Sequence, residues 1–236
     1  MPEITDYTLS LERSRNSLTR ADRPRTFTLA GREWDLLDGV FAPPFSASTG
    51  AAMELLGLAG TDLRPWHGSF LEVGCGTGVI ALSAALAGCD RVTALDISPQ
   101  AVRNTAANAD RHGLAERVRV LHSDLFDALA PEDRYDTVYW HSNFVLAPDS
   151  YRYKSDHERA YVDPGYRAHQ RFLIDAPAHV AAGGRILLHF SNRGDVRALH
   201  ALGHRCGRRL REAAALPVGE GTDEVRHLLY EITVTD

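Results

Sequence analysis

The stretch LEVGCGTGVIAL, residues 71–82, places three glycines between a strand-like apolar run and a helical pattern. At Gly74, Gly76 and Gly78 the missing side chains let a ligand approach the backbone, and the start of the following helix offers unpaired N–H groups. A dinucleotide fingerprint, GxGxxG, would need a glycine where Val79 stands, so the spacing here is GxGxG. The loop therefore predicts a site for a nucleoside-containing ligand and disfavours a nicotinamide cofactor.

Three carboxylates lie on or just after successive predicted strands. Asp96 ends the second strand, where a carboxylate can accept hydrogen bonds from both ribose hydroxyls. Asp124 follows the third strand and could accept a hydrogen bond from an adenine amino group, while Glu72 on the first strand suits a cationic ligand better than a phosphate. Alone, the glycine loop could be a tight turn and Asp96 a helix cap. Their order along the chain favours a binding site.

The stretch RYDTVYWHSNFVLAP, residues 134–148, ends a fourth predicted strand with polar and aromatic side chains. Because open α/β sheets bind ligands at the carboxyl ends of their strands, His141 and Asn143 are candidate catalytic residues. His141 could accept a proton or a hydrogen bond from an attacking nitrogen or hydroxyl near neutral pH, and Asn143 could orient that group. Phe144 and Trp140 could stack on a flat or cationic substrate. Alternatively, His141 is a hydrogen-bonded loop residue and Trp140 fills the core.

The elements that must position these residues alternate between short apolar runs and helical patterns, which is typical of a parallel sheet covered by helices on both faces. We expect parallel strands at 70–73, 91–96, 118–122, 135–140 and 185–190, helices at 79–87, 99–112, 165–181 and 195–206, and a terminal antiparallel hairpin at 208–217 and 225–234. The fold class is therefore α/β, with a doubly wound, mostly parallel sheet of seven strands.

The front of the chain, residues 1–60, has too few apolar residues for a core of its own, so we expect an extension or lid on a catalytic domain at 61–236. It contains a hairpin at 25–37 that turns at Ala30 and Gly31, and a helix at 49–58.

Residues 145–164 show no periodicity and are longer than an ordinary strand-to-helix connection, so we expect a loop that covers the substrate. Tyr151 and Tyr161 are candidate substrate contacts, and Tyr153 and acids such as Asp156 could also line a pocket for a small polar molecule such as an amino acid or a guanidine. The alternative is a solvated loop with paired surface charges.

The amino-acid composition limits the classes of partner that we expect. The net charge is −5 at a pI near 6.1, without a long basic run, which favours a small molecule or a protein over nucleic acid. The three cysteines lack CxxC spacing and no membrane-length apolar run or signal core is evident, so we expect a cytoplasmic protein. His200 and His204 have metal-compatible spacing but no third ligand, so we predict no metal. The oligomeric state stays open.

Three stretches, FLEVGCGTGVIALSAA, VTALDISPQAVRNTAANADRHGL and VRVLHSDLF, together resemble the class I S-adenosylmethionine-dependent methyltransferases over residues 70–191. The preceding DGVFAPPFSASTGAAMELL resembles the branch with the release-factor glutamine and small-domain ribosomal RNA guanine methyltransferases. The resemblance implies a Rossmann-like fold that binds S-adenosylmethionine. It implies cofactor contacts at Phe45, Ser48 and Thr49 above the cofactor, Gly74, Gly76 and Thr77 at the methionine end, Asp96 at the ribose, and Ile97, Asp124 and Leu125 at the adenine. We expect Glu72, Gly78 and His141 to contact the cofactor as well.

The fourth strand departs from that branch, whose Asn-Pro-Pro-Tyr motif is replaced here by His141, Ser142, Asn143 and Phe144. We therefore expect N-methylation of a small polar molecule such as an amino acid or guanidine, with natural-product biosynthesis as one setting. The alternative within the same chemistry is a protein glutamine or an RNA base. A cofactor-binding module without catalysis and a nicotinamide oxidoreductase are the alternatives of other classes.

Overall fold

The computed structural model describes residues 6–60, 66–220 and 223–234. The elements in chain order are α1 Tyr7–Thr19, β1 Thr26–Leu29, β2 Arg32–Asp35, η1 Pro43–Phe45, α2 Ser48–Leu56, β3 Ser69–Val73, α3 Val79–Leu86, β4 Arg91–Asp96, α4 Pro99–Arg111, β5 Val118–His122, β6 Tyr135–His141, β7 Val145–Ala147, η2 Asp156–Ala160, β8 Val162–Pro164, α5 Arg167–Asp175, η3 Ala176–His179, β9 Val180–Ser191, α6 Val196–Arg205, β10 Arg208–Glu220 and β11 Asp223–Val234. Within these ranges no helix has the length and apolar character needed to cross a membrane.

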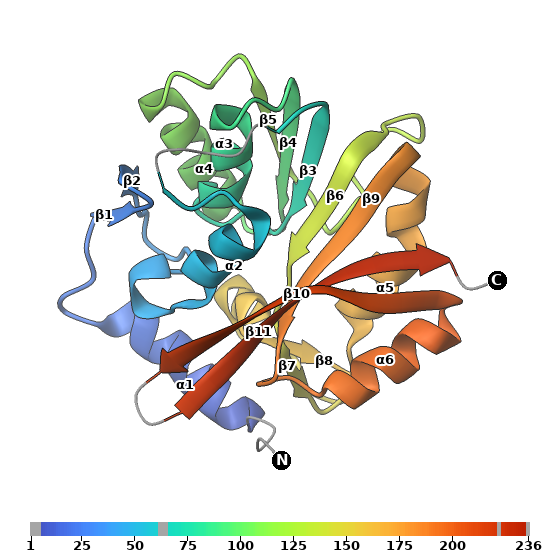
Figure 1. The fold of residues 1–236 in the computed structure, drawn as a ribbon. Helices are drawn as coiled ribbons and strands as arrows, with labels where there is room; N and C mark the ends of the chain where they lie inside the picture. Colours follow the sequence, from blue (N-terminus) through green and yellow to red (C-terminus); the bar gives the residue numbers. More distant parts are fainter. Residues whose placement is uncertain (1–5, 61–65, 221–222, 235–236) are drawn as a thin grey trace.

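The seven-stranded sheet has the order β10-β11-β9-β6-β3-β4-β5. The five central and distal strands from β9 to β5 pair in parallel, and β11 joins β9 and β10 in antiparallel pairs. Helices α3 and α4 lie on one face and α5 and α6 on the other (Figure 1). The predicted α/β fold with a mostly parallel sheet of seven strands, including the terminal hairpin, is confirmed.

Two apolar clusters fill the space between the sheet and its helices. Neighbouring strand residues point to opposite faces, so Phe70 belongs to the cluster under α3 and Leu71 to the cluster under α5 and α6. Both side chains are fully buried. Burial on both faces explains why the central strands have continuous apolar runs rather than alternating ones.

The helix predicted at 165–181 is shorter. α5 ends at Asp175, a 3-10 turn spans Ala176–His179, and β9 already begins at Val180. Pro177 explains the break, because proline lacks the N–H that an α-helix needs and disfavours helical backbone in the preceding residue.

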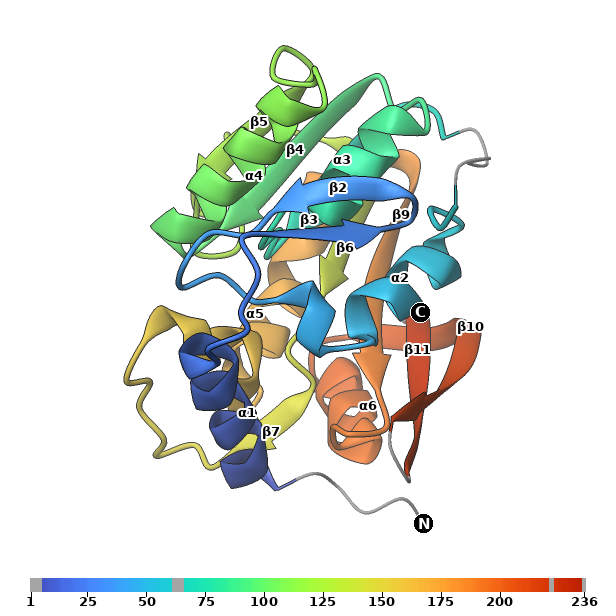
Figure 2. The same cartoon turned by 90° about the vertical axis from the view of Figure 1, so that its left-hand side faces the viewer.

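The predicted front hairpin is confirmed, with Leu29 paired to Arg32 and left-handed backbone at Ala30 and Gly31. This two-residue turn has the handedness that suits the twist of a hairpin. The hairpin lies across α3 and α4 (Figure 2). Its Trp34 is fully buried and belongs to the same apolar cluster as the α3 side chains. The proposed division into 1–60 and 61–236 falls at residues 61–65, which lie outside the described residues.

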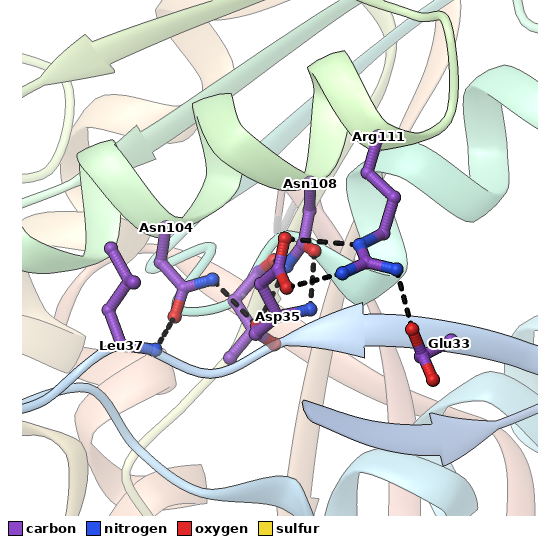
Figure 3. Close-up of polar contacts among 7 residues, drawn as sticks. Glu33, Asp35, Leu37, Asn104, Asn108 and Arg111 are labelled. Carbon is purple, nitrogen blue, oxygen red and sulfur yellow. Dashed lines mark hydrogen bonds and ion pairs between the residues drawn. The ribbon is translucent and has the colours of Figure 1, made fainter. Parts of the chain in front are cut away.

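Polar side chains of α4 hold the strand that leaves this hairpin (Figure 3). The Asn104 amide accepts a hydrogen bond from the Leu37 N–H at 2.8 Å and donates to the Asp35 carbonyl at 2.8 Å. The Asn108 amide accepts from the Asp35 N–H at 2.7 Å and donates to the carbonyls of Asp35 and Thr77 at 3.0 and 2.8 Å. Arg111 forms ion pairs with Asp35 and Glu33. α4 therefore joins the front segment to the glycine loop.

Two regions differ from the sequence prediction. α1 was not predicted, because its buried residues are Ser10, Leu11, Ser14 and Ser17 and so lack an apolar period. The segment 145–164, predicted as an irregular loop, contains β7, η2 and β8, with β7 and β8 forming a parallel pair that contacts α1. Strands of three residues are too short to give a detectable alternation.

We expect Asn108→Ala to lower the free energy of unfolding by about 3 kcal/mol, because it leaves the Asp35 N–H and the buried Thr77 carbonyl without their side-chain partner. Urea unfolding of the cofactor-free protein measures this loss. Arg103→Ala, on the exposed side of the same helix, is the matched control and should change stability by less than about 0.5 kcal/mol. Equal stability of the two variants would contradict the role given to Asn108.

Candidate active site

The carboxyl ends of β3, β4, β5 and β6 open onto one cavity of about 640 Å³. Its position follows from the topology, because these strands run in the same direction and end at the same edge. All but two of the predicted site residues line it: Phe45, Ser48, Thr49, Glu72, Gly74, Gly76, Thr77, Asp96, Ile97, Asp124, Leu125, Trp140, His141, Asn143, Phe144 and Tyr161.

Gly78 and Tyr151 are the two exceptions, and neither lines the cavity. Gly78 has φ +82° at the N-terminus of α3, and a Cβ there would lie 2.7 Å from Thr105 Cγ2, so its role is close packing against α4. Tyr151 donates its hydroxyl to Glu158 at 2.9 Å and packs on Tyr7 at 5.9 Å between ring centroids. These contacts direct Tyr151 away from the predicted substrate pocket.

The glycine loop forms an open cradle at Gly76. Its φ is +57°, and nothing lies within 4 Å of the point where a Cβ would stand. The Gly76 N–H donates to Asp96 Oδ2 at 2.8 Å, which fixes the loop against the end of β4. The left-handed backbone at Gly76 favours glycine, and the open space beside it leaves room for a ligand to contact the backbone.

Asp96 keeps acceptor capacity in the cavity. It is 9% exposed, and its two oxygens accept one hydrogen bond each, from Gly76 and Ser98 at 2.8 Å. Burial raises the pKa of Asp96, although these backbone hydrogen bonds lower it. A carboxylate oxygen can accept more than one hydrogen bond, so both oxygens can also accept from ribose hydroxyls.

Glu72 adds a second buried acid beside Asp96. Its Oε2 accepts a hydrogen bond from the Ala81 N–H of α3 at 2.8 Å. Burial raises the pKa of Glu72 well above its ordinary value, and the negative charge of Asp96 raises it further. Two buried acids in one cavity favour a ligand with positive charge.

On the side of the cavity where adenine is expected, Asp124 forms an ion pair with Arg171, with 2.9 Å between Asp124 Oδ1 and Arg171 Nη1. Its neighbour Leu125 has left-handed backbone, φ +52°, which is uncommon for a residue with a β-carbon. Leu125 and Ile97 both line the cavity. The residues present therefore fit S-adenosylmethionine, with an open glycine cradle, a ribose acceptor and acids for its cationic end.

His141 is half-buried between the rings of Phe144 and His189, with centroid distances of 5.8 and 4.4 Å. Burial lowers the pKa of His141 to about 3, and His227 lowers it further. The imidazole is therefore neutral at physiological pH and can accept a hydrogen bond. The lowered pKa favours a role as hydrogen-bond acceptor over one as general base, because a base with this pKa holds a proton weakly. The catalytic role of His141 stays a prediction.

Two histidines that the sequence prediction did not single out lie behind His141. His189 is its register partner on β9, and His189 Nε2 lies 3.1 Å from His227 Nδ1 on β11. Both are buried, and burial lowers the pKa of each. Their positions on predicted strands were visible in the sequence, but only the order of the strands in the sheet brings the three rings together.

Asn143 is 7% exposed and holds the following segment in place. Its Nδ2 donates to the carbonyls of Arg159 and Val162, both at 2.8 Å. Two carbonyls on one side fix the orientation of the amide, because only its nitrogen can donate to them. Its Oδ1 is buried and has no hydrogen-bond partner.

The three aromatic candidates that line the cavity differ in their contacts. Trp140 reaches the cavity but is 6% exposed and packs on His169 and Phe172 at 4.7 and 5.0 Å, so the core alternative describes most of its contacts. Phe144 lies beside His141, and Tyr161 packs against Phe41 at 5.5 Å.

Sequence reasoning missed the part of the cavity wall that α1 provides, namely Ser10, Arg13, Asn16 and Ser17, with Arg20 at the helix C-cap. The segment 145–164, expected from the sequence to cover the substrate, adds Tyr153, Asp156, His157, Arg159 and Ala160, and Arg193 follows β9. The α1 residues recur every three or four positions, the spacing of one helix face, and this was the available signal. Across the described ranges no cluster of three or more His, Cys, Asp or Glu side chains is suited to a metal ion.

The model of a methyltransferase domain matches residues 70–159. Among curated proteins, the release factor glutamine methyltransferase of Bordetella pertussis is 36% identical over 124 residues, covering 49% of this chain and 45% of that protein. The protein of the same name from Chlorobaculum tepidum is 32% identical over 163 residues, covering 63% and 54%. The chain spans about half the length of these curated relatives.

Solved structures share the fold. The 16S rRNA N2 G1207 methyltransferase of T. thermophilus, solved with AdoMet and guanosine, has a TM-score of 0.56 at 22% identity. The match covers 87% of this chain and 49% of that one.

The buried acid Glu72 gives a pH prediction. Because its pKa is raised in the fold, the wild type loses stability as pH rises above the unfolded value of about 4.3 toward the folded one. Glu72→Gln cannot ionise and keeps an oxygen for the Ala81 N–H, so its stability relative to wild type should increase with pH between about 5 and 8. Urea unfolding without cofactor measures this, with the exposed Glu54→Gln as control. Parallel pH profiles for Glu72→Gln and wild type would disprove the prediction.

Three observations indicate the same kind of protein. They are the glycine cradle with its buried acids, the match of residues 70–159 to a methyltransferase domain, and the topology of the sheet. The chain contains a methyltransferase domain with the class I S-adenosylmethionine-dependent fold, and its sequence is similar to the release-factor and uL3 glutamine methyltransferases.

Proposed function

We propose that the chain transfers a methyl group from S-adenosylmethionine to a nitrogen of an acceptor that enters the same cavity. One observation carries the proposal: a single cavity connects Gly76 and Asp96 with His141, Asn143 and Phe144. An acceptor held by the second group therefore stands beside a cofactor held by the first.

When bound, S-adenosylmethionine supplies an electrophilic methyl group on a sulfonium. The chain then has to align the acceptor nitrogen with that methyl and exclude water, because in-line displacement needs positioning more than covalent chemistry. The buried Asn143 Oδ1 has no partner and can accept a hydrogen bond from an acceptor N–H. The neutral His141 ring can accept a second one, and Phe144 offers a flat apolar surface.

For the acceptor, we propose a small polar molecule. Two features support it. α1 packs on β7, β8 and η2 and so adds a wall to the cavity. The Asn-Pro-Pro-Tyr motif is absent, and the amide that stands in this stretch, Asn143, gives both its hydrogens to the chain itself.

A second candidate is the glutamine of a protein or a base of RNA. The similarity to release factor glutamine methyltransferases favours the protein acceptor. A labelled-methyl screen distinguishes the two: transfer to amino acids or guanidines supports the first, and transfer only to a glutamine-containing peptide or to guanosine-containing RNA supports the second.

Calorimetry tests the cofactor. We expect S-adenosylmethionine and its demethylated product to bind and NAD not to bind. Asp96→Ala should weaken cofactor binding by about 1 to 3 kcal/mol, because it removes hydrogen bonds to a charged group and releases the Gly76 N–H. Asp110→Ala, exposed on α4, is the matched control and should bind like wild type. Binding of NAD alone would refute the proposal.

Turnover tests the acceptor side. We expect His141→Ala and Asn143→Ala to lose at least about tenfold in labelled-methyl transfer, since each removes one of the proposed hydrogen-bond acceptors, while cofactor affinity is retained. The exposed His204→Ala on α6 is the control for His141. Cofactor binding without transfer to any acceptor by wild type would instead support the binding-module alternative. Unchanged transfer by both variants would remove these residues from the mechanism.

A further inference from the structure

α1 turns a polar face toward the cavity. A helix that packs for stability alone buries an apolar stripe, but α1 buries three serines and one leucine. Arg13, Asn16 and Ser17 from this helix and Arg20 at its C-cap line the cavity. The helix also contacts η2, β7 and β8, and these contacts hold its polar face in place. A polar face at a cavity fits contact with a polar ligand.

The cations of this wall differ in how they are paired. Arg20 forms a close ion pair with Asp22 at 2.6 Å and lies over the Phe45 ring at 4.4 Å. Arg159 lies 3.4 Å from Asp156 and over the Tyr153 ring. Arg13 has no ion pair within the described ranges, and it is exposed although it lines the cavity. It therefore stands at the opening with its charge available.

Among the described residues no carboxylate forms an ion pair with Arg13. The positive charge of Arg13 acts on the phenol of Tyr161, whose pKa is raised by burial while Arg23 and Arg13 partly offset that rise. The acids that line the cavity are Glu72, Asp96, Asp124 and Asp156, and the two among them that are buried lie on β3 and at the end of β4. The cavity thus presents acids to the cofactor and a cation at the α1 wall.

The Asn143 amide is a second, independent feature, and it indicates which group of the ligand enters the cavity. The buried Asn143 Oδ1 has no partner and its amide orientation is fixed, so it needs a donor from the ligand. The ligand must therefore present an N–H to Asn143. The guanidinium of Arg13 is a planar donor that matches the two oxygens of a carboxylate or phosphate.

We propose that the methyl acceptor is an N–H compound with an anionic oxygen group, a carboxylate or a phosphate, which Arg13 binds at the opening while Asn143 holds the N–H inside. This deepens the proposed function and rests on it. It replaces the cationic acceptor considered from the sequence with an anionic one.

The test uses simple anions as probes on the whole chain saturated with the demethylated cofactor product. Thermal unfolding is followed in sodium acetate and in sodium phosphate, each against sodium chloride at equal ionic strength. We expect one of these anions to stabilise wild type, with half-saturation shifted at least about tenfold higher in Arg13→Gln. A response to acetate indicates a carboxylate acceptor, and a response to phosphate a phosphorylated one.

Arg15→Gln is the matched control, since Arg15 is exposed on the same helix and does not line the cavity. It should respond to the anion as wild type does. An equal anion response in all three proteins, or no response in wild type, overturns the proposal. Calorimetry on the same samples reports cofactor affinity: failure of wild type to bind cofactor counts against the proposed function, whereas a loss confined to Arg13→Gln assigns Arg13 to the cofactor and overturns this inference.

Discussion

The site depends on one constraint: the glycine loop must keep its backbone groups satisfied while leaving one side open. Three neighbours do this. Asp96 accepts from the Gly76 N–H, Thr105 donates to the Gly76 carbonyl at 3.1 Å, and Asn108 donates to the Thr77 carbonyl. Two of them come from α4 and one from the end of β4. Because the loop is held from outside, no side chain of its own has to fill the cradle.

The same support reaches the front of the chain. Asn108 binds Asp35 as well as Thr77, so the hairpin, α4 and the loop share one buried amide (Figure 3). Burial then has opposite effects on the groups around the cavity. It raises the pKa of Glu72 and lowers that of His141, so it favours the neutral form of both: an uncharged acid on the cofactor side and a neutral imidazole on the acceptor side.

The sequence predicted those parts that follow a period or a spacing. The buried strands, the glycine spacing and the carboxylate after each strand all lie in short segments whose meaning is local. α1 was missed because its buried serines carry no apolar period, and β7 and β8 because they have three residues each. The row of His141, His189 and His227 depends on which strands are neighbours, which no local pattern encodes. Asn143 was placed at the site, but its bonds to Arg159 and Val162 arise from a return of the chain that could not be read in advance.

The hydrogen bond between Ser14 and His157, 2.7 Å long, joins positions separated by 143 residues. Contacts of such long sequence separation form slowly, because the loop between them must close first. During synthesis, β3, β4 and the loop between them are complete before η2 has been made. The cofactor side of the cavity can therefore fold before η2 is made. α1 can form its contact with η2 only after that. For the same reason, detaching that helix would open the cavity while leaving the sheet intact.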